Sequence, residues 1–213
     1  MLYWYEHNYP FNFLFDLSNV LSIVLITLLI CKYFKISGNF KILCLMSCFT
    51  PFLFNGFLFE WTMFPDQTKY LHSTALCRTG NCPVYLDNIP LSVQNIIYTL
   101  VPIPFIEGFK SVAFINRLIL ISFAIYLYVK KFNKEFILLL FFLPSMILYS
   151  SVSIRDSFTV IVALLMMNFY FDKKYYYAFF VFIIFYLIKP PNAFFIGTIL
   201  IFHQFIFINK NKK

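Results

Sequence analysis

The sequence SVAFINRLILISFAIYLYVKKFNKEFILLLFFLPSMILYSSVSI occupies residues 111–154 and decides the fold class. Two long apolar runs flank a short polar turn that contains Lys130, Lys131 and Lys134. A membrane-crossing helix needs about 20 mainly apolar residues, because the hydrocarbon core of a bilayer is about 30 Å thick. Both runs approach that length, so this stretch predicts two membrane-spanning helices joined by a basic turn.

The composition of the whole chain has the same character. Apolar residues make up 61% of the 213 residues and charged residues only 12%. Soluble domains usually contain about 45–50% apolar residues. The composition therefore excludes a soluble globular domain, a disordered chain and a disulfide-rich secreted scaffold. The long unbroken apolar runs also favour helices over the alternating strands of a transmembrane barrel.

Charge-free windows predict an all-α, polytopic protein with seven transmembrane helices in a single domain, residues 1–213. The windows are Leu17–Cys31 (preceded by Phe11–Phe15), Ile42–Phe59, Leu118–Val129 (extended upstream to Ser111), Phe136–Ile154, Ser157–Phe171, Tyr175–Ile188 and Pro190–Asn209. The window Asn88–Ile106 is also free of charge, but three prolines interrupt it. We interpret it as an interfacial or re-entrant segment of one longer outer loop.

The lysines indicate how these helices are oriented. Eleven lysines lie in the turns after the first, third and fifth spans or in the C-terminal tail. With seven spans all eleven fall on one side, which the positive-inside rule identifies as cytoplasmic. We therefore expect a multi-pass protein of the bacterial inner membrane, with its N-terminus outside and its C-terminus inside. Because the lysines mark topology, the net charge of +8 predicts contact with membrane lipid and not with nucleic acid.

The first candidate site is the outer-loop sequence PDQTKYLH, residues 65–72. The carboxylate of Asp66 can act as a general base for a sugar hydroxyl, or it can bind a divalent cation that activates a phosphate leaving group. Tyr70 and His72 can donate hydrogen bonds to a sugar. The alternative is that Asp66 is an ordinary solvated acid in a turn or at a helix cap.

Several cations are expected near the outer membrane boundary. Arg155 and Asp156 precede a predicted span of 15 residues, Lys189 follows one of 14, and Arg117 is followed by 12 apolar residues. A cation at that depth faces protein or a water-filled cavity, and it suits a phosphate. The alternative is that these side chains extend to lipid phosphates and that Asp156 caps a helix. We expect Arg117 to pair with Glu107 or Asp156.

Two cysteines, Cys77 and Cys82, frame the sequence CRTGNC in the outer loop. Four intervening residues that include a glycine permit a small disulfide-closed loop, and the periplasm is oxidising. Zinc is disfavoured, because only His72 lies nearby and a zinc site takes four ligands. The sequence has no Walker loop or dinucleotide fingerprint, so ATP-driven transport has no support.

Three segments in this order resemble bacterial membrane glycosyltransferases of the GT-C type and Wzy-like polysaccharide polymerases. They are PDQTKY at residues 65–70, LPSMILYSSVSIRD at residues 143–156 and KPP at residues 189–191. The resemblance implies transfer of sugars from a polyprenyl-linked donor on the periplasmic face, in O-antigen or capsule synthesis. It implies that Asp66, or Glu60 in its place, is the catalytic acid and that Arg155 and Lys189 bind the phosphate.

The chain also departs from that family. Members usually have more spans and a longer chain, and the acid normally follows the first span, whereas here it follows the second. The chain therefore corresponds to a truncated or minimal member, or to a helper subunit with partners in polysaccharide assembly. The alternative function is a non-catalytic membrane protein: a lipid-linked oligosaccharide flippase subunit, a small transporter or an accessory factor.

Overall fold

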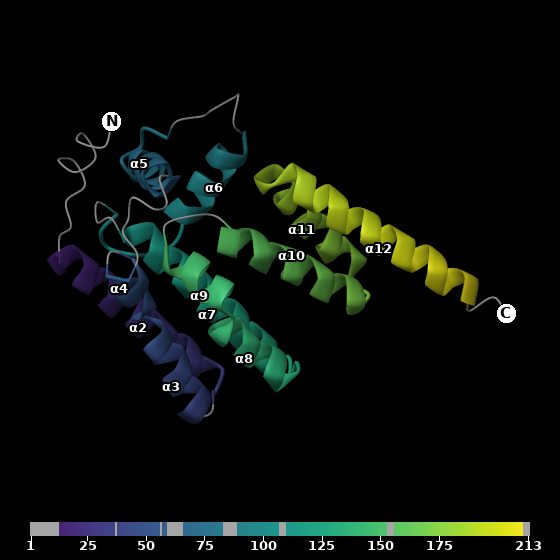
Figure 1. Cartoon of the computed structure of the whole chain (residues 1–213), viewed down its shortest axis with the longest axis horizontal. Coiled ribbons are helices and arrows are strands. Elements are labelled where there is room, and N and C mark those ends of the chain that lie inside the picture. The colour runs from purple at the N-terminus through teal and green to yellow at the C-terminus, as the bar shows by residue number, and fades with distance from the viewer. Residues whose placement is uncertain are drawn as a thin grey trace. The chain divides into compact units, whose positions relative to one another are not determined.

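The structure is a computed structural model of the 213-residue chain. It describes residues 13–36, 38–55, 57–58, 66–82, 89–106, 110–152 and 156–210, with side chains as far as residue 206. Within these ranges the chain forms α-helices and their connections, and no strand occurs (Figure 1). The all-α class predicted from the sequence is confirmed.

The helices follow one another with short connections. Their bounds are α2 Phe13–Tyr33, α3 Gly38–Ser47, α4 Thr50–Phe54, α5 Asp66–Arg78, α6 Ile89–Thr99, α7 Ser111–Val129, α8 Lys134–Phe142, α9 Pro144–Ser151, α10 Asp156–Phe171, α11 Tyr175–Ile188 and α12 Pro190–Lys210.

Two helices in the described ranges, α2 and α7, are long and apolar enough to cross a membrane. The pair α8 and α9 makes a third if its bend of 56° lies inside one span. The segments Gly38–Phe54, Asp156–Phe171 and Tyr175–Ile188 are apolar but shorter. By length and composition, two or three helices in the described ranges could therefore cross a membrane, whereas the sequence predicts seven spans. This indicates association with a membrane.

Prolines explain where the helices depart from the predicted spans. The predicted span Ile42–Phe59 is divided into α3 and α4, and Pro51 lies in the first turn of α4. The predicted span Phe136–Ile154 is divided at Leu143, which is extended (φ −64°, ψ 119°) in front of Pro144. Proline has no N–H to continue a helix, and it disfavours the helical conformation in the residue before it.

The window predicted to lie at the interface, Asn88–Ile106, contains α6 followed by irregular chain. α6 has 11 residues. At 1.5 Å per residue it is about 16 Å long, which is too short to cross a bilayer. Its length fits a segment that does not cross.

The chain divides into two compact units, residues 1–84 with 94–158 and residues 85–93 with 159–213. In the first unit α7 is the central helix, against which α2, α3, α4, α5, α8 and α9 pack (Figure 1). Every side chain of α7 from Ser111 to Leu118 is buried. A helix that is apolar on all sides is stable only when other helices or lipid surround it. α7 therefore forms the core of this unit.

In the second unit α11 packs along α12. A Cβ atom on Gly197 of α12 would lie 2.9 Å from Cε2 of Phe182 in α11, so the glycine permits this close approach. The hydroxyl of Tyr170 in α10 lies 3.0 Å from the carbonyl oxygen of Leu200 and 2.8 Å from Oε1 of Gln204. These hydrogen bonds connect α10 with α12.

Candidate functional site

Arg117 lies in α7 with only 1% of its surface exposed. Its Nε donates to the carbonyl oxygen of Ser47, 2.9 Å away, and its Nη1 donates to Oγ of Ser150, 2.5 Å away. Both acceptors are neutral, and no carboxylate within the described ranges pairs with this guanidinium. Because arginine stays protonated, the interior of the first unit carries a positive charge at this point.

A local break in the backbone supplies the acceptor at Ser47. In a continuous helix the carbonyl of Ser47 would accept a hydrogen bond from the N–H four residues later. That residue is Pro51, which has no N–H. The carbonyl therefore accepts from Arg117, and it also accepts from Oγ1 of Thr50 at 3.0 Å. The proline that interrupts the predicted second span thus provides a partner for the buried arginine.

The end of α9 contributes two serine hydroxyls. Ser150 Oγ accepts from Arg117 and donates to the carbonyl oxygen of Met146, 2.5 Å away in the same helix. Ser151 Oγ donates to Oγ1 of Thr50 at the start of α4, 3.0 Å away. These bonds hold the end of α9 against α4 and α7. The candidate residues Arg155 and Asp156 follow this helix end closely in the sequence.

The residue before the arginine, Asn116, binds the next part of that segment. Its Nδ2 donates to the carbonyl oxygen of Val152, 3.0 Å away, and its Oδ1 accepts from the hydroxyl of Tyr98 at 2.5 Å. The ring of Tyr98 packs against Phe158, with 5.8 Å between ring centroids. Val152 and Phe158 flank Arg155, which itself lies outside the described residues. Both flanks are therefore held near Asn116.

A further polar group lies at the starts of α2 and α7. Oδ2 of Asp16 is 3.4 Å from Nζ of Lys110, which also lies 5.1 Å from the ring centroid of Phe52. Asn19 makes two hydrogen bonds to the backbone of Phe105. Its Nδ2 donates to the carbonyl oxygen at 2.7 Å, and its Oδ1 accepts from the N–H at 3.0 Å. These contacts fasten the irregular chain after α6 to α2.

The sequence interpretation did not assign a role to Asp16 or Asn19. The available signal was an acid and an amide three residues apart at the edge of an apolar run. Polar residues in such a run usually face the interior of a helix bundle. The side chains of Asp16 and Asn19 are buried, as this rule predicts.

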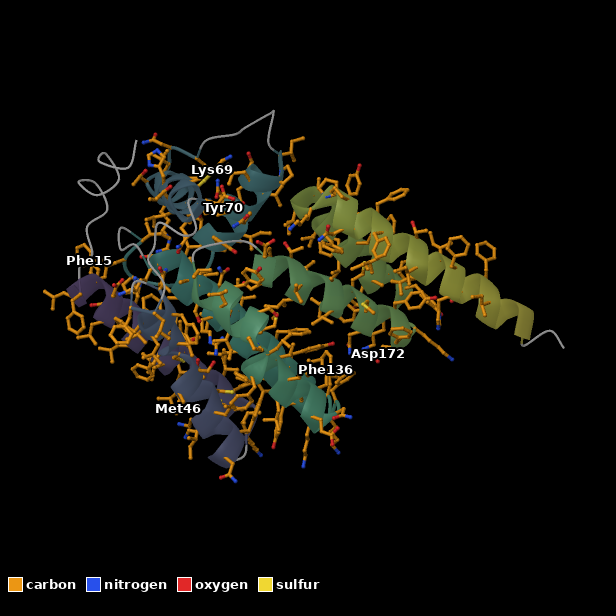
Figure 2. All side chains as sticks on the ribbon, in the orientation of Figure 1. Phe15, Met46, Lys69, Tyr70, Phe136 and Asp172 are labelled. Atoms are coloured by element: carbon orange, nitrogen blue, oxygen red, sulfur yellow. A yellow bond between two sulfur atoms is a disulfide. The ribbon has the colours of Figure 1, made fainter. Side chains whose placement is uncertain are left out.

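The predicted outer-loop acid begins a helix. Asp66 is the first residue of α5 and is exposed, and a carboxylate at this position is stabilised by the helix dipole. Tyr70 lies one turn later on α5 and is buried (Figure 2). His72 is half-buried, and burial lowers the pKa of its imidazole, which favours the neutral form. The two predicted sugar ligands lie on different faces of the helix, because two residues correspond to about 200°.

α4 connects the polar residues around Arg117 with the start of α5, where Asp66 lies. Thr50, at the start of α4, hydrogen-bonds with the end of α9, as described above. After α4, Nδ2 of Asn55 donates to Oε1 of Gln67, 2.9 Å away, and Gln67 directly follows Asp66. α4 has five residues, which correspond to about 7.5 Å of helix. Asp66 and Arg117 are therefore connected through one short helix and do not form an ion pair with each other.

The end of α5 is fixed by a covalent bond and by an arginine. Cys77 and Cys82 form the disulfide that the sequence predicts. The guanidinium of Arg78 donates to the backbone carbonyls of Val101 and Ile103. Both interactions hold α5 in place, and the second ties it to the chain that follows α6.

The remaining predicted site residues do not all meet in the described structure. Asp156 begins α10 and is half-buried, and the predicted ion pair between it and Arg117 is not formed. The guanidinium instead uses the freed backbone carbonyl and the serine hydroxyl. Lys189 lies between α11 and α12 in the second unit and is half-buried. Glu60, Glu107 and Arg155 lie outside the described residues.

Buried polar groups near Tyr98 lack a partner in the described part of the chain. They are both amide atoms of Gln94, Nδ2 of Asn95 and Oγ of Ser157, and all three residues are 0% exposed. A buried polar group without a hydrogen bond costs about 1–3 kcal/mol. These atoms can therefore be satisfied by hydroxyl groups or water that enter this region.

The divalent cation considered for Asp66 stays a prediction. Among the residues that the structure describes, no three His, Cys, Asp or Glu side chains converge in a way that could hold a metal ion. Glu60, the other candidate acid, is outside those residues.

The fold and the site define an all-helical protein with helices that can cross a membrane and a buried polar cluster around Arg117. No protein-family model, curated protein or solved structure matches the chain.

Proposed function

We propose that the chain is a membrane glycosyltransferase, or a polysaccharide repeat-unit polymerase, of the GT-C or Wzy-like type. It uses a polyprenyl-phosphate-linked sugar donor on the periplasmic face of the bacterial inner membrane. In this proposal seven spans place the N-terminus outside and the C-terminus inside. The product belongs to a surface polysaccharide such as O-antigen or capsule.

The observation that carries the proposal is the guanidinium of Arg117, which is buried and whose hydrogen-bond acceptors in the described part of the chain are both neutral. A charge held away from water is costly unless it is paired and hydrogen-bonded. A phosphate is a suitable partner, because its oxygens match the planar donors of a guanidinium. The charge also lies six residues after the start of α7, which corresponds to about 9 Å below that helix end.

Two further features support the same site. Asn116 donates to the carbonyl oxygen of Val152 and accepts from Tyr98, whose ring packs against Phe158, so the described residues on both sides of position 155 are held beside the residue that precedes Arg117. Both amide atoms of Gln94 and the Nδ2 of Asn95, which lack a hydrogen-bond partner in the described part of the chain, can bind sugar hydroxyls as donors and acceptors.

The proposed reaction is a displacement at the anomeric carbon of the donor sugar. Asp66, or Glu60 in its place, accepts the proton of the acceptor hydroxyl, whose oxygen forms the new bond to that carbon. The bond from the carbon to the polyprenyl phosphate breaks, and the leaving phosphate keeps the electron pair. Arg155 and Arg117 stabilise the negative charge that develops on it.

Complementation of a deletion strain tests the proposal. We expect Asp66→Asn and Arg155→Ala to shorten or abolish the surface polysaccharide on a gel. The matched controls are Asp172→Asn and Lys173→Ala, which change exposed charges in the turn after α10. The enzyme proposal fails if Asp66→Asn, Arg155→Ala and a further variant, Glu60→Gln, all give polymer of normal length.

A reconstituted assay distinguishes the enzyme from a flippase or transporter. Purified full-length protein in liposomes is given a polyprenyl-linked oligosaccharide and an acceptor. We expect a new glycosidic product and no increase in the rate at which the lipid-linked sugar crosses the bilayer. Transport without product formation would favour the non-catalytic alternative.

A further inference from the structure

The end of the first unit that carries the α2–α3 and α7–α8 turns contains two adjoining cavities. One has a volume of about 330 Å³ and is lined by residues that include Asn39, Phe40, Tyr128 and Lys134. The other has a volume of about 470 Å³, and its lining includes Phe34 and Lys131 together with the same Tyr128 and Lys134. These volumes fall in the range of small-molecule pockets, about 300–1,000 Å³. The site described above does not include them.

The charge around the cavities is strongly positive. Lys131 and Lys134 line them and are exposed, and no carboxylate in the described part of the chain forms an ion pair with either. The two turns also contain Lys35 and Lys130, against one acid, Glu135. An ammonium group that faces a cavity without an acid partner attracts an anion.

The two turns share a backbone motif that presents lysine at the corner. Lys35 and Lys131 have positive φ values of 52° and 55°. In both turns the N–H of the next residue bonds to the carbonyl five positions earlier, at 2.9 and 3.0 Å. Glycine is the usual residue at this position after a helix, because a side chain there is unfavourable. Lys173 in the turn after α10 has the same conformation, with φ 60°, so the described chain has a cation three times where glycine would be more stable.

The other walls of the cavities are aromatic. The rings of Phe40 and Tyr128 are stacked, with centroids 4.4 Å apart and an angle of 8° between their planes. Phe34 and Phe132 line the second cavity and are each about half exposed, at 46% and 42%. Apolar rings beside ammonium groups match a ligand that has both a phosphate and a hydrocarbon part.

We propose that these adjoining cavities bind the headgroup of an anionic phospholipid. Lys131 and Lys134 hold the phosphate, and the aromatic walls cover the glycerol and the start of the acyl chains. Basic pockets between transmembrane helices on the side rich in lysine recognise such headgroups. This proposal does not depend on the proposed glycosyltransferase activity, because it concerns other residues and requires no reaction.

Native mass spectrometry of the purified full-length protein tests this site. The probes are dioleoyl-phosphatidylglycerol and dioleoyl-phosphatidylcholine, added to protein in a neutral detergent. We expect the anionic lipid to bind more tightly, and the Lys131→Gln/Lys134→Gln variant to bind it at least tenfold more weakly. Each lysine near an anionic lipid contributes on the order of fivefold in affinity.

Two matched variants make the result specific. Lys131→Arg/Lys134→Arg keeps the charge and should retain binding within about threefold. Lys173→Gln/Lys174→Gln removes the same charge from the turn between α10 and α11 and should leave the binding constant unchanged. Since all four lysines are exposed, none of these changes is expected to affect folding, and circular dichroism checks this.

Three outcomes would overturn the proposal. The first is equal affinity for the two lipids, and the second is unchanged affinity in the Lys131→Gln/Lys134→Gln variant. The third concerns the source of the phosphate, and it is tested with inorganic phosphate as a competitor. If millimolar inorganic phosphate displaces phosphatidylglycerol completely, the cavities bind free phosphate and not a lipid.

Discussion

Arg117 donates a hydrogen bond from Nε to the backbone carbonyl oxygen of Ser47, 70 residues earlier in the chain and 2.9 Å away. The carbonyl is available because Pro51 cannot donate to it. A buried cation is thus held by a backbone break and a serine hydroxyl, without a carboxylate in the described part of the chain. Because no carboxylate in the described part of the chain depends on this guanidinium, its effect on stability and its proposed role in binding an anion can be tested separately.

The first prediction concerns that separation. Arg117→Met should leave the thermal stability in detergent unchanged or higher, because replacing a buried charge with an apolar side chain of similar size is often neutral or stabilising. The same change should lower the yield of polysaccharide at least tenfold, since it removes the guanidinium that is proposed to bind the phosphate. Thermal unfolding followed by circular dichroism and the complementation assay measure the two effects.

The control for this prediction is Ser150→Ala, which leaves the guanidinium short of one acceptor. We expect a loss of about 1–3 kcal/mol in the free energy of unfolding. If the methionine variant proves less stable than this serine variant, Arg117 has a structural role and does not support the proposed function.

The second prediction concerns the ion pair between Asp16 and Lys110, whose closest atoms are 3.4 Å apart. In a double-mutant cycle with Asp16→Asn and Lys110→Gln, we expect a coupling energy of about 1–3 kcal/mol, because both side chains are largely removed from solvent. Unfolding in increasing sodium dodecyl sulfate measures it. The same cycle with exposed Lys69 in place of Lys110 should give a coupling near zero.

The third prediction is a count of thiols. The chain has five cysteines, of which Cys77 and Cys82 are paired and Cys31, Cys44 and Cys48 are free and buried. A maleimide should label three thiols after denaturation and five after denaturation with reduction, as read by mass spectrometry. The native protein should react slowly or not at all. Five labelled thiols without reduction would contradict the disulfide.

The fourth prediction tests the proposed topology with single cysteines in a cysteine-free variant. Cysteine in place of Lys35, Lys131 or Lys173 should react only from the cytoplasmic side, since all three turns are rich in lysine. Cysteine in place of exposed Thr79 on the outer loop should react from the periplasmic side. Labelling of Lys131→Cys and Thr79→Cys from the same side would refute the arrangement.

The fifth prediction concerns the contact between α11 and α12. Gly197→Ala should lower the free energy of unfolding by about 1–3 kcal/mol, because the new Cβ meets Cε2 of Phe182 at 2.9 Å. Adding Phe182→Leu should restore part of the loss by removing that ring. Gly38→Ala is the matched control, because a Cβ there meets nothing within 4 Å. Equal effects of the two alanine variants would show that the contact does not limit packing.

The sequence alone was sufficient to predict the features that depend on neighbouring residues. The helical class follows from the long apolar runs, and the bounds of α11 agree with the charge-free window Tyr175–Ile188. The disulfide between Cys77 and Cys82 follows from their short spacing. Each of these features is set by forces that act within a few residues, so the order of amino acids contains the information directly.

The lengths of the spans were harder to predict. Hydropathy treats Ile42–Phe59 and Phe136–Ile154 as continuous, although Pro51 and Pro144 divide both. The windows record how apolar a segment is, but not whether its backbone can continue as one helix. The freed carbonyl at the first of these breaks then became part of the candidate site.

Only the tertiary structure decided which polar groups meet. The sequence identified Arg117 as a deeply placed cation but indicated an acid as its partner, and the partners found are 70 and 33 residues away and neutral. The two hydrogen bonds of Asn19 to Phe105 join positions 86 residues apart. A buried polar side chain must bond to whatever group the packed helices bring within about 3 Å, and that depends on how those helices are placed.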